Sequence, residues 1–224
     1  MELFTLTEKM DDLVTTYLIN HRDCIAVHIS SGGVYGSDFA EPANKDKMLS
    51  VSVNNIKKSN YYSIVKLNAE AKHRAAANLK IVDIRLFSYF SKYIDLSNNY
   101  FMTDIVRSIQ SGTQLITNRD NFVRDYIHPG DLAQLIYLSI CQKKNLTVDA
   151  YSAHPISKYE ILEYVQSNFG LTFRYDDVSS SATGEKSQYY SIYKEAKEIE
   201  YNPRFTSSDS IKDGLSGLLG QSFT

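Results

Sequence analysis

The 224-residue sequence predicts an α/β fold in which helices cover a parallel sheet. Helix-like and strand-like segments alternate in the first half of the chain, and this order is typical of parallel strands joined by crossovers. The segments 24–30 and 80–87 are nearly continuous apolar runs, which indicates strands that are covered on both faces. Shorter elements follow to the end of the chain, so we expect a small α/β lobe beside the main sheet.

Hydrophobic periodicity places the individual elements. Apolar residues recur at helical spacing over 3–20, and a longer helix is expected over 56–77. Residues 37–55 are polar and irregular and are interpreted as a surface loop. Beyond residue 88, the predicted helices are 98–110, 129–141, 158–168, 191–199 and 208–218, the predicted strands are 114–116, 146–151 and 171–175, residues 124–128 are extended, and 176–187 form a loop.

Composition and charge exclude several classes of function. The net charge of −2 offers no basic surface for nucleic acid or an anionic membrane. No run approaches the ~20 apolar residues of a membrane span, and the first residues lack the order of a signal peptide. Cys24 and Cys141 lie in apolar runs and are interpreted as buried thiols of a reducing compartment. We therefore expect a cytoplasmic protein, and we assign no metal ligands.

The stretch from His28 to Gly36 carries the first chemical signal. Apolar and β-branched residues give way to small ones, Ser30, Ser31, Gly32 and Gly33. Glycines allow the tight turn with which a buried strand ends, so the preceding serine hydroxyl is presented at the edge of the sheet. The alternative is that these hydroxyls only satisfy backbone groups at a turn.

A tyrosine and a lysine supply the second signal. Tyr62 and Lys66 lie one turn apart on one helix face, and an ammonium beside a phenol lowers the phenol's pKa. Such a phenol can pass a proton to a carbonyl oxygen near neutral pH. The same spacing begins at Tyr190 and Tyr193, but only Tyr62 lies between the strand-end serine and the second buried strand.

Three segments resemble the extended short-chain dehydrogenase/reductase family of nucleotide-sugar epimerases, reductases and dehydratases. Residues 30–36 are similar to the family's Ser-[Ser/Thr]-x-x-Val-Tyr-Gly, residues 85–91 resemble Arg-x-Phe-Asn-x-Tyr-Gly, and residues 124–132 resemble Arg-Asp-[Phe/Tyr]-Ile-His-Val-x-Asp-[Leu/Val]. The resemblance runs from about residue 3 to residue 218 and implies the C-terminal portion of a Rossmann-type doubly wound parallel sheet. Residues 1–90 would be part of the dinucleotide-binding region. Residues 91–224 would mostly form the substrate-binding lobe, with some segments returning to the sheet.

The resemblance implies a catalytic group and a cofactor. Ser31 would polarise the reacting carbonyl, Tyr62 would be the acid/base, and Lys66 would support Tyr62 and bind the ribose of NAD or NADP. Ser30 and Phe87 are expected beside the same cofactor, together with Tyr62 and Lys66.

The substrate implied by the resemblance is a nucleoside-diphosphate sugar. Arg124 would bind the diphosphate, since a guanidinium matches phosphate geometry, and Ser31 and Ser88 would also contact the substrate. Dehydratases of the family carry acidic residues where this chain has Gly32 and Gly33. Glycine cannot transfer a proton, so we expect an epimerase or a 4-ketoreductase rather than a dehydratase.

One family motif is not found in its expected context. Members open with a strand, Gly-x-x-Gly-x-x-Gly and a helix, whereas the spacing Gly214, Gly217 and Gly220 follows a helical stretch and is interpreted as a C-terminal tail. We therefore expect weak or no NAD(P) binding by this chain alone.

A non-catalytic remnant and an interaction module stay open as alternatives. Helices 3–20 and 56–77 match those that build the dimer in relatives, so we expect a homodimer or another covering chain.

Overall fold

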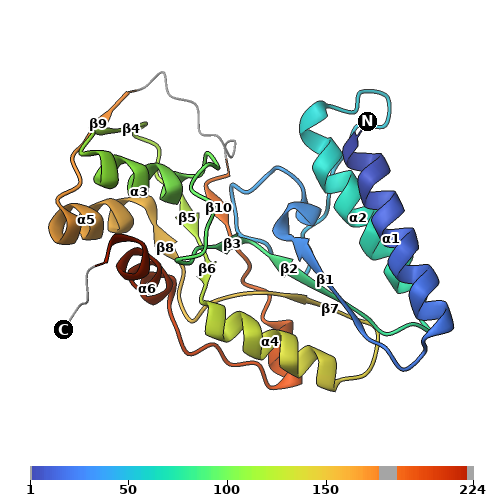
Figure 1. The fold of residues 1–224 in the computed structure, drawn as a ribbon. Helices are drawn as coiled ribbons and strands as arrows, with labels where there is room; N and C mark the ends of the chain where they lie inside the picture. The colour runs from blue at the N-terminus through green and yellow to red at the C-terminus, as the bar shows by residue number, and fades with distance from the viewer. Residues whose placement is uncertain (1, 177–185, 221–224) are drawn as a thin grey trace.

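The computed structural model describes residues 2–176 and 186–220 (Figure 1). Three short 3₁₀ helices, η1 to η3, accompany the α-helices and strands. In chain order, the elements are α1 (Glu2–Asn20), β1 (Ala26–Ser31), η1 (Gly32–Tyr35), η2 (Lys58–Asn60), α2 (Tyr61–Ala75), β2 (Ile81–Leu86), β3 (Ser88–Tyr89), α3 (Phe101–Ser111), β4 (Leu115–Thr117), β5 (Val123–Arg124), β6 (Tyr126–Ile127), α4 (Pro129–Cys141), β7 (Leu146–Asp149), β8 (Ile156–Ser157), α5 (Lys158–Phe169), β9 (Phe173–Tyr175), β10 (Gln188–Tyr189), η3 (Glu195–Ile199) and α6 (Ser207–Leu219).

The main sheet has the parallel order β1-β2-β7, with Ser31 opposite Leu86 and Ile84 opposite Val148. Helices α1 and α2 lie on one side of this sheet, and α4 lies on the other (Figure 1). Because successive side chains of a strand point to opposite faces, β2 presents different chemistry to each side. Its Ile84 joins the apolar core with Val148 and with Leu135 of α4, whereas Asp83 contacts α2. The predicted α/β fold with a parallel sheet is confirmed.

The smaller lobe contains α3, α5 and α6 and three short sheets, β10-β5-β8, β3-β6 and β4-β9 (Figure 1). Its core is a separate apolar cluster that includes Phe90, Ile105, Ile161 and Leu215, all fully buried. Strand β7 comes from beyond residue 90 yet pairs with β2 in the main sheet. The division of the chain at residue 90 stays a prediction.

Several expected boundaries and environments differ in the structure. The helix expected from residue 56 is preceded by η2 and begins as α2 at Tyr61, and the expected helix 191–199 is reduced to η3. The interpretation of Cys24 and Cys141 as buried thiols is wrong, because both are exposed. Cys24 precedes β1 and Cys141 is the last residue of α4, so neither is enclosed by the sheet or the helix.

The interpretation of residues 37–55 as a surface loop is wrong in part. Phe39 and Ala43 are fully buried, and Ala43 forms a β-bridge with Ser191. An isolated apolar residue in a polar stretch gives no periodic signal, so hydrophobic periodicity does not predict the burial of Phe39 and Ala43. Most of the loop expected at 176–187 lies outside the described residues, as does the chain end after Gly220. Among the described residues, no helix combines the length and hydropathy needed to cross a membrane.

Candidate active site

Ser31 is the last residue of β1, at the carboxyl end of the main sheet. Its side chain caps η1: Oγ accepts a hydrogen bond from the backbone N–H of Gly33 at 3.0 Å. The same oxygen lies 3.2 Å from the hydroxyl of Tyr189. The Ser31 hydroxyl thus satisfies a backbone N–H of the turn, as the alternative expects, and it also contacts a second hydroxyl. Its role toward a reacting carbonyl stays a prediction.

Tyr62 packs closely against Gly33, which has no side chain. Tyr62 lies in the first turn of α2, and a Cβ added at Gly33 would be only 2.6 Å from its ring and 3.3 Å from Ser31 Oγ. The Tyr62 side chain is 43% exposed, so a ligand can contact it. The glycine turn and the start of α2 thus bring a phenol beside the serine.

Lys66 follows one turn later on α2. Its Nζ lies 5.8 Å from the centroid of the Tyr62 ring. Burial lowers the pKa of Lys66, while the carboxylates of Glu70 and Asp83 act in the opposite direction. Tyr62 therefore lies between Gly33, which Ser31 Oγ also contacts, and the ammonium of Lys66.

An aromatic group encloses the other side of this site. Phe87 is buried and packs against Tyr35, Phe39 and Tyr189, with ring centroids 5.3 to 6.3 Å apart. A Cβ at Gly32 would be 2.3 Å from the Phe87 ring, so only glycine fits there. Phe87 is a fixed wall of the site.

Tyr189 connects the serine to the arginine predicted to bind the substrate. The guanidinium of Arg124 lies 5.7 Å from the Tyr189 ring centroid and donates a 2.6 Å hydrogen bond to the carbonyl of Lys186. Burial raises the pKa of Tyr189 to about 12, the hydrogen bond with Ser31 opposes this shift, and neighbouring Tyr62 adds to it. Sequence reasoning missed Tyr189 as a site residue, since no local pattern links it to a serine 158 positions away.

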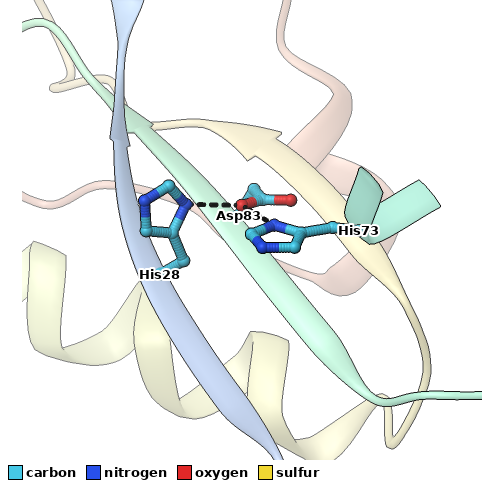
Figure 2. Close-up of side chains that lie close together, drawn as sticks. All are labelled: His28, His73 and Asp83. Carbon is cyan, nitrogen blue, oxygen red and sulfur yellow. Dashed lines mark hydrogen bonds and ion pairs between the residues drawn. The ribbon is translucent and has the colours of Figure 1, made fainter. Parts of the chain in front are cut away.

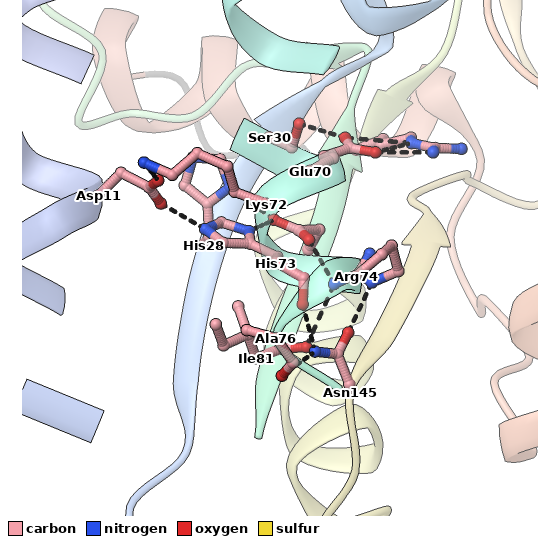
Figure 3. A network of polar contacts seen from close by, with 12 residues as sticks. Asp11, His28, Ser30, Glu70, Lys72, His73, Arg74, Ala76, Ile81 and Asn145 are labelled. Atoms are coloured by element: carbon pink, nitrogen blue, oxygen red, sulfur yellow. Dashed lines mark hydrogen bonds and ion pairs between the residues drawn. The ribbon is translucent and has the colours of Figure 1, made fainter. Parts of the chain in front are cut away.

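Ser30 lies elsewhere, as the alternation of a strand requires. Its hydroxyl is buried and donates a 2.6 Å hydrogen bond to Glu70 of α2 (Figure 3). Glu70 is in turn paired with Arg85 at 2.7 Å, and Arg85 donates to Tyr35, which bonds to Asp149. Ser30 therefore belongs to a buried polar chain that joins α2 to the sheet, and its expected contact with a cofactor stays a prediction.

Ser88 pairs with a strand of the smaller lobe. It lies in β3, where it pairs with Tyr126 of β6, and its side chain is half-buried. Within residues 2–176 and 186–220, no polar contact joins its side chain to Ser31 or Tyr62. Its role toward a substrate stays a prediction.

These features define a Rossmann-type α/β protein with a serine, a tyrosine and a lysine at the carboxyl end of a parallel strand. The sequence profile of the NAD dependent epimerase/dehydratase family matches residues 10–171. The chain belongs to the NAD-dependent epimerase/dehydratase family. No curated protein shows significant sequence similarity to it.

Solved structures share this fold at low sequence identity. A dTDP-glucose 4,6-dehydratase from Bacillus anthracis in complex with NAD is 16% identical with a TM-score of 0.73, over 96% of this chain and 66% of that one. A UDP-N-acetylglucosamine 4-epimerase from Methanobrevibacter ruminantium is 15% identical with a TM-score of 0.77, over 95% and 68%. A UDP-glucuronic acid 4-epimerase from Bacillus cereus is 18% identical with a TM-score of 0.71, over 94% and 67%. The chain thus spans about two thirds of the length of these proteins.

Proposed function

We propose that this chain carries the catalytic group of an NAD(P)-dependent nucleotide-sugar epimerase or 4-ketoreductase. The observation that carries the proposal is that Ser31 and Tyr62 both lie against Gly33, with Lys66 Nζ 5.8 Å from the centroid of the Tyr62 ring. Tyr62 would exchange a proton with an oxygen of the sugar, Lys66 would favour the ionised phenol electrostatically, and Ser31 would hold the same sugar oxygen by a hydrogen bond.

The substrate side of the proposal is supported by Arg124. Arg124 is only 6% exposed, and among the described residues its guanidinium donates hydrogen bonds from Nη1 to the carbonyls of Val123 and Lys186. A planar guanidinium binds a diphosphate through two parallel hydrogen bonds. The UDP-sugar ligands of the related 4-epimerase structures agree with this chemistry.

The glycines favour epimerase or ketoreductase chemistry over dehydration. Eliminating water from a sugar requires an acid and a base close to the reacting carbons. Gly32 and Gly33 carry no such group, and a side chain at either position would collide with Phe87 or Tyr62.

The cofactor site would be incomplete in this chain alone. The phenol of Tyr62 and the ammonium of Lys66 suit the ribose hydroxyls of NAD or NADP, and a bound dinucleotide would supply the hydride chemistry. The spacing Gly214, Gly217 and Gly220 cannot cradle a pyrophosphate, since it lies in α6 with Gly214 packed against Phe90. We therefore propose that the 224-residue chain binds NAD(P) weakly by itself.

The test compares two adjacent tyrosines. Tyr62→Phe removes the proposed proton-transfer oxygen, whereas Tyr61→Phe makes the same change on a residue of similar exposure, 39% against 43%. With NAD⁺ and a UDP-sugar at millimolar concentration, conversion to the C4 epimer is followed by chromatography, and reduction of a 4-keto sugar by NADPH is followed by absorbance. We expect Tyr62→Phe to lower the rate by ~10²–10⁴-fold and Tyr61→Phe to leave it unchanged.

Binding of the substrate provides a second readout. Calorimetry of UDP-glucose with the wild type and with Arg124→Lys tests the diphosphate contact without any turnover. Weaker binding by Arg124→Lys supports the proposal. A chain that neither turns over nor binds any nucleoside-diphosphate sugar refutes it.

An interaction through α1 is a second candidate function, and one observation favours it. Residues Leu6, Met10, Leu13 and Tyr17 of α1 are between 52% and 66% exposed, so an apolar stripe is left uncovered. Such a stripe is typical of a helix that packs against a partner. We propose a homodimer through α1 and α2, or another chain that covers them.

A further inference from the structure

A second cluster of potential ligand groups, distinct in its residues from the proposed catalytic group, lies on the α2 side of the main sheet, where the carboxylate of Asp83 also acts on the Lys66 ammonium. His28 of β1 and His73 of α2 both direct Nδ1 at Oδ1 of Asp83 in β2, at 2.7 and 2.8 Å (Figure 2). The three ligand atoms lie within 4.8 Å of one another. Two imidazole nitrogens and one carboxylate oxygen from three different elements therefore converge on one point.

Neighbouring groups orient these side chains. Nε2 of His73 is 2.5 Å from Oδ1 of Asp11 in α1, so this carboxylate holds the Nε2 proton and turns Nδ1 toward Asp83. Arg74 donates a 2.6 Å hydrogen bond to the second oxygen of Asp83 and leaves Oδ1 for the histidines. A carboxylate on the far nitrogen of a histidine is the usual outer partner of a metal-binding imidazole.

We propose that His28, His73 and Asp83 bind a divalent transition metal of the zinc type. Nitrogen and oxygen ligands at about 2.0–2.2 Å in tetrahedral geometry lie about 3.3 Å apart. The two nitrogens would each move away from Asp83 Oδ1 by about half an ångström to reach that spacing. Movements of this size lie within the reach of small side-chain rotations.

The cluster also offers a route of entry and an open coordination position. His73 and Asp83 are buried, but the His28 side chain is 29% exposed. His28 lies on β1, whose outer edge pairs with no strand among the residues that the structure describes. Water can therefore reach the fourth position of a tetrahedral site.

The alternative is a network of ion pairs in which the Nδ1–H groups of the two histidines bond to the Asp83 carboxylate and no metal binds. The metal site and the ion-pair network differ in a measurable way, because a metal must displace the Nδ1 protons of the histidines. Metal binding at this site therefore releases protons, and its apparent affinity rises with pH. It also joins β1, β2 and α2 through coordinate bonds, and so raises the melting temperature.

The experiment is a titration of the metal-free 224-residue chain with Zn²⁺ by calorimetry, and with Co²⁺ by visible absorption. We expect one Zn²⁺ per chain and the intense Co²⁺ bands of a four-coordinate site. His28→Gln should weaken Zn²⁺ binding by about 100-fold or more, since outer-shell partners alone are worth 10–100-fold. Because His28 is partly exposed, this variant is expected to fold, unlike changes at buried Asp83.

Two further variants make the outcome decisive. His21→Gln removes an exposed histidine whose ring nitrogen Nδ1 bonds to the carbonyl of Tyr17, and it should leave Zn²⁺ binding unchanged. His28→Cys replaces one zinc ligand by another and should restore binding that His28→Gln loses. The proposal is overturned if the wild type binds no stoichiometric Zn²⁺, or if His28→Gln binds as tightly as the wild type. It is also overturned if Zn²⁺ binding depends on exposed Cys24, tested with Cys24→Ser.

Discussion

Replacing either of two adjacent glycines, Gly32 or Gly33, by alanine should have different effects: the first should lower stability, and the second should lower the reaction rate. Neither Gly32 nor Gly33 has a positive φ, so alanine at either position acts through its added methyl group alone. At Gly32 the new carbon would lie 2.3 Å from the ring of Phe87, and at Gly33 it would lie 2.6 Å from the ring of Tyr62. Ordinary contact begins at 3.4 Å, so these rings would have to retreat by 1.1 and 0.8 Å.

The difference lies in what surrounds each ring. Phe87 is 7% exposed and packs against Tyr35 and Tyr189, so it cannot retreat without strain. Overpacking of this kind costs about 1–3 kcal/mol, which lowers Tm by about 2–12 °C in a chain of this size. Tyr62 is 43% exposed and can rotate into solvent, so Gly33→Ala should cost less than about 1 kcal/mol.

Urea denaturation followed by circular dichroism measures both values, a suitable probe because the chain has no tryptophan. Gly33→Ala should instead move Tyr62 away from Ser31, and a displacement near 1 Å can cost ~10²-fold in rate. The NMR resonances of the Tyr62 ring report that movement directly. Equal losses of stability in the two variants, or an unmoved Tyr62 in Gly33→Ala, would refute the reasoning.

Three other expectations concern the core, a helix cap and the exposed stripe. Phe90→Ala should lower the free energy of unfolding by about 3–5 kcal/mol, since Phe90 is fully buried; urea denaturation measures it. Hydrogen bonds from Ser157 hold the pKa of Glu160 below its usual range. The ionised Glu160 carboxylate therefore stabilises the folded state at any pH above the pKa that Glu160 has in the unfolded chain, and this contribution is lost as the pH falls through the lower pKa of the folded state. Ser157→Ala should cost about 0.5–2 kcal/mol near pH 7 and flatten the acid limb of the stability curve. Leu13→Lys should convert the proposed dimer to a monomer in sedimentation while leaving the circular dichroism spectrum of the folded chain unchanged, because Leu13 is 66% exposed.

The sequence predicted best those features that depend on residues close together in the chain: strands, turns and side chains one helical turn apart. Apolar runs located β1 and β2, and the turn glycines after Ser31 indicated correctly which hydroxyl ends the strand. One helical turn separates Tyr62 from Lys66, so their proximity follows from helix geometry. Placing that pair beside the serine required the family resemblance, since the contact spans a loop without periodicity.

Contacts between distant segments could not be predicted. Phe39 is buried by packing against Phe87 and Tyr189, which lie about 50 and 150 positions further along. The ligand atoms of the histidine cluster meet only because β1, α2 and β2 fold onto one another. Tyr189 follows the segment 177–185, outside the described residues, and nothing in its own neighbourhood of the sequence ties it to Ser31.

The attachment of α1 has a consequence for how the molecule opens. Leu18 is the one apolar residue of α1 that is fully enclosed, while Lys72 of α2 bonds to Glu8, Asp11 and Asp12 at 2.6 to 2.9 Å. Charged contacts at a surface weaken as ionic strength rises, whereas apolar burial does not. The amides of α1 should therefore exchange with deuterium before those of β2, and added salt should widen that gap by releasing the helix from a sheet that stays folded.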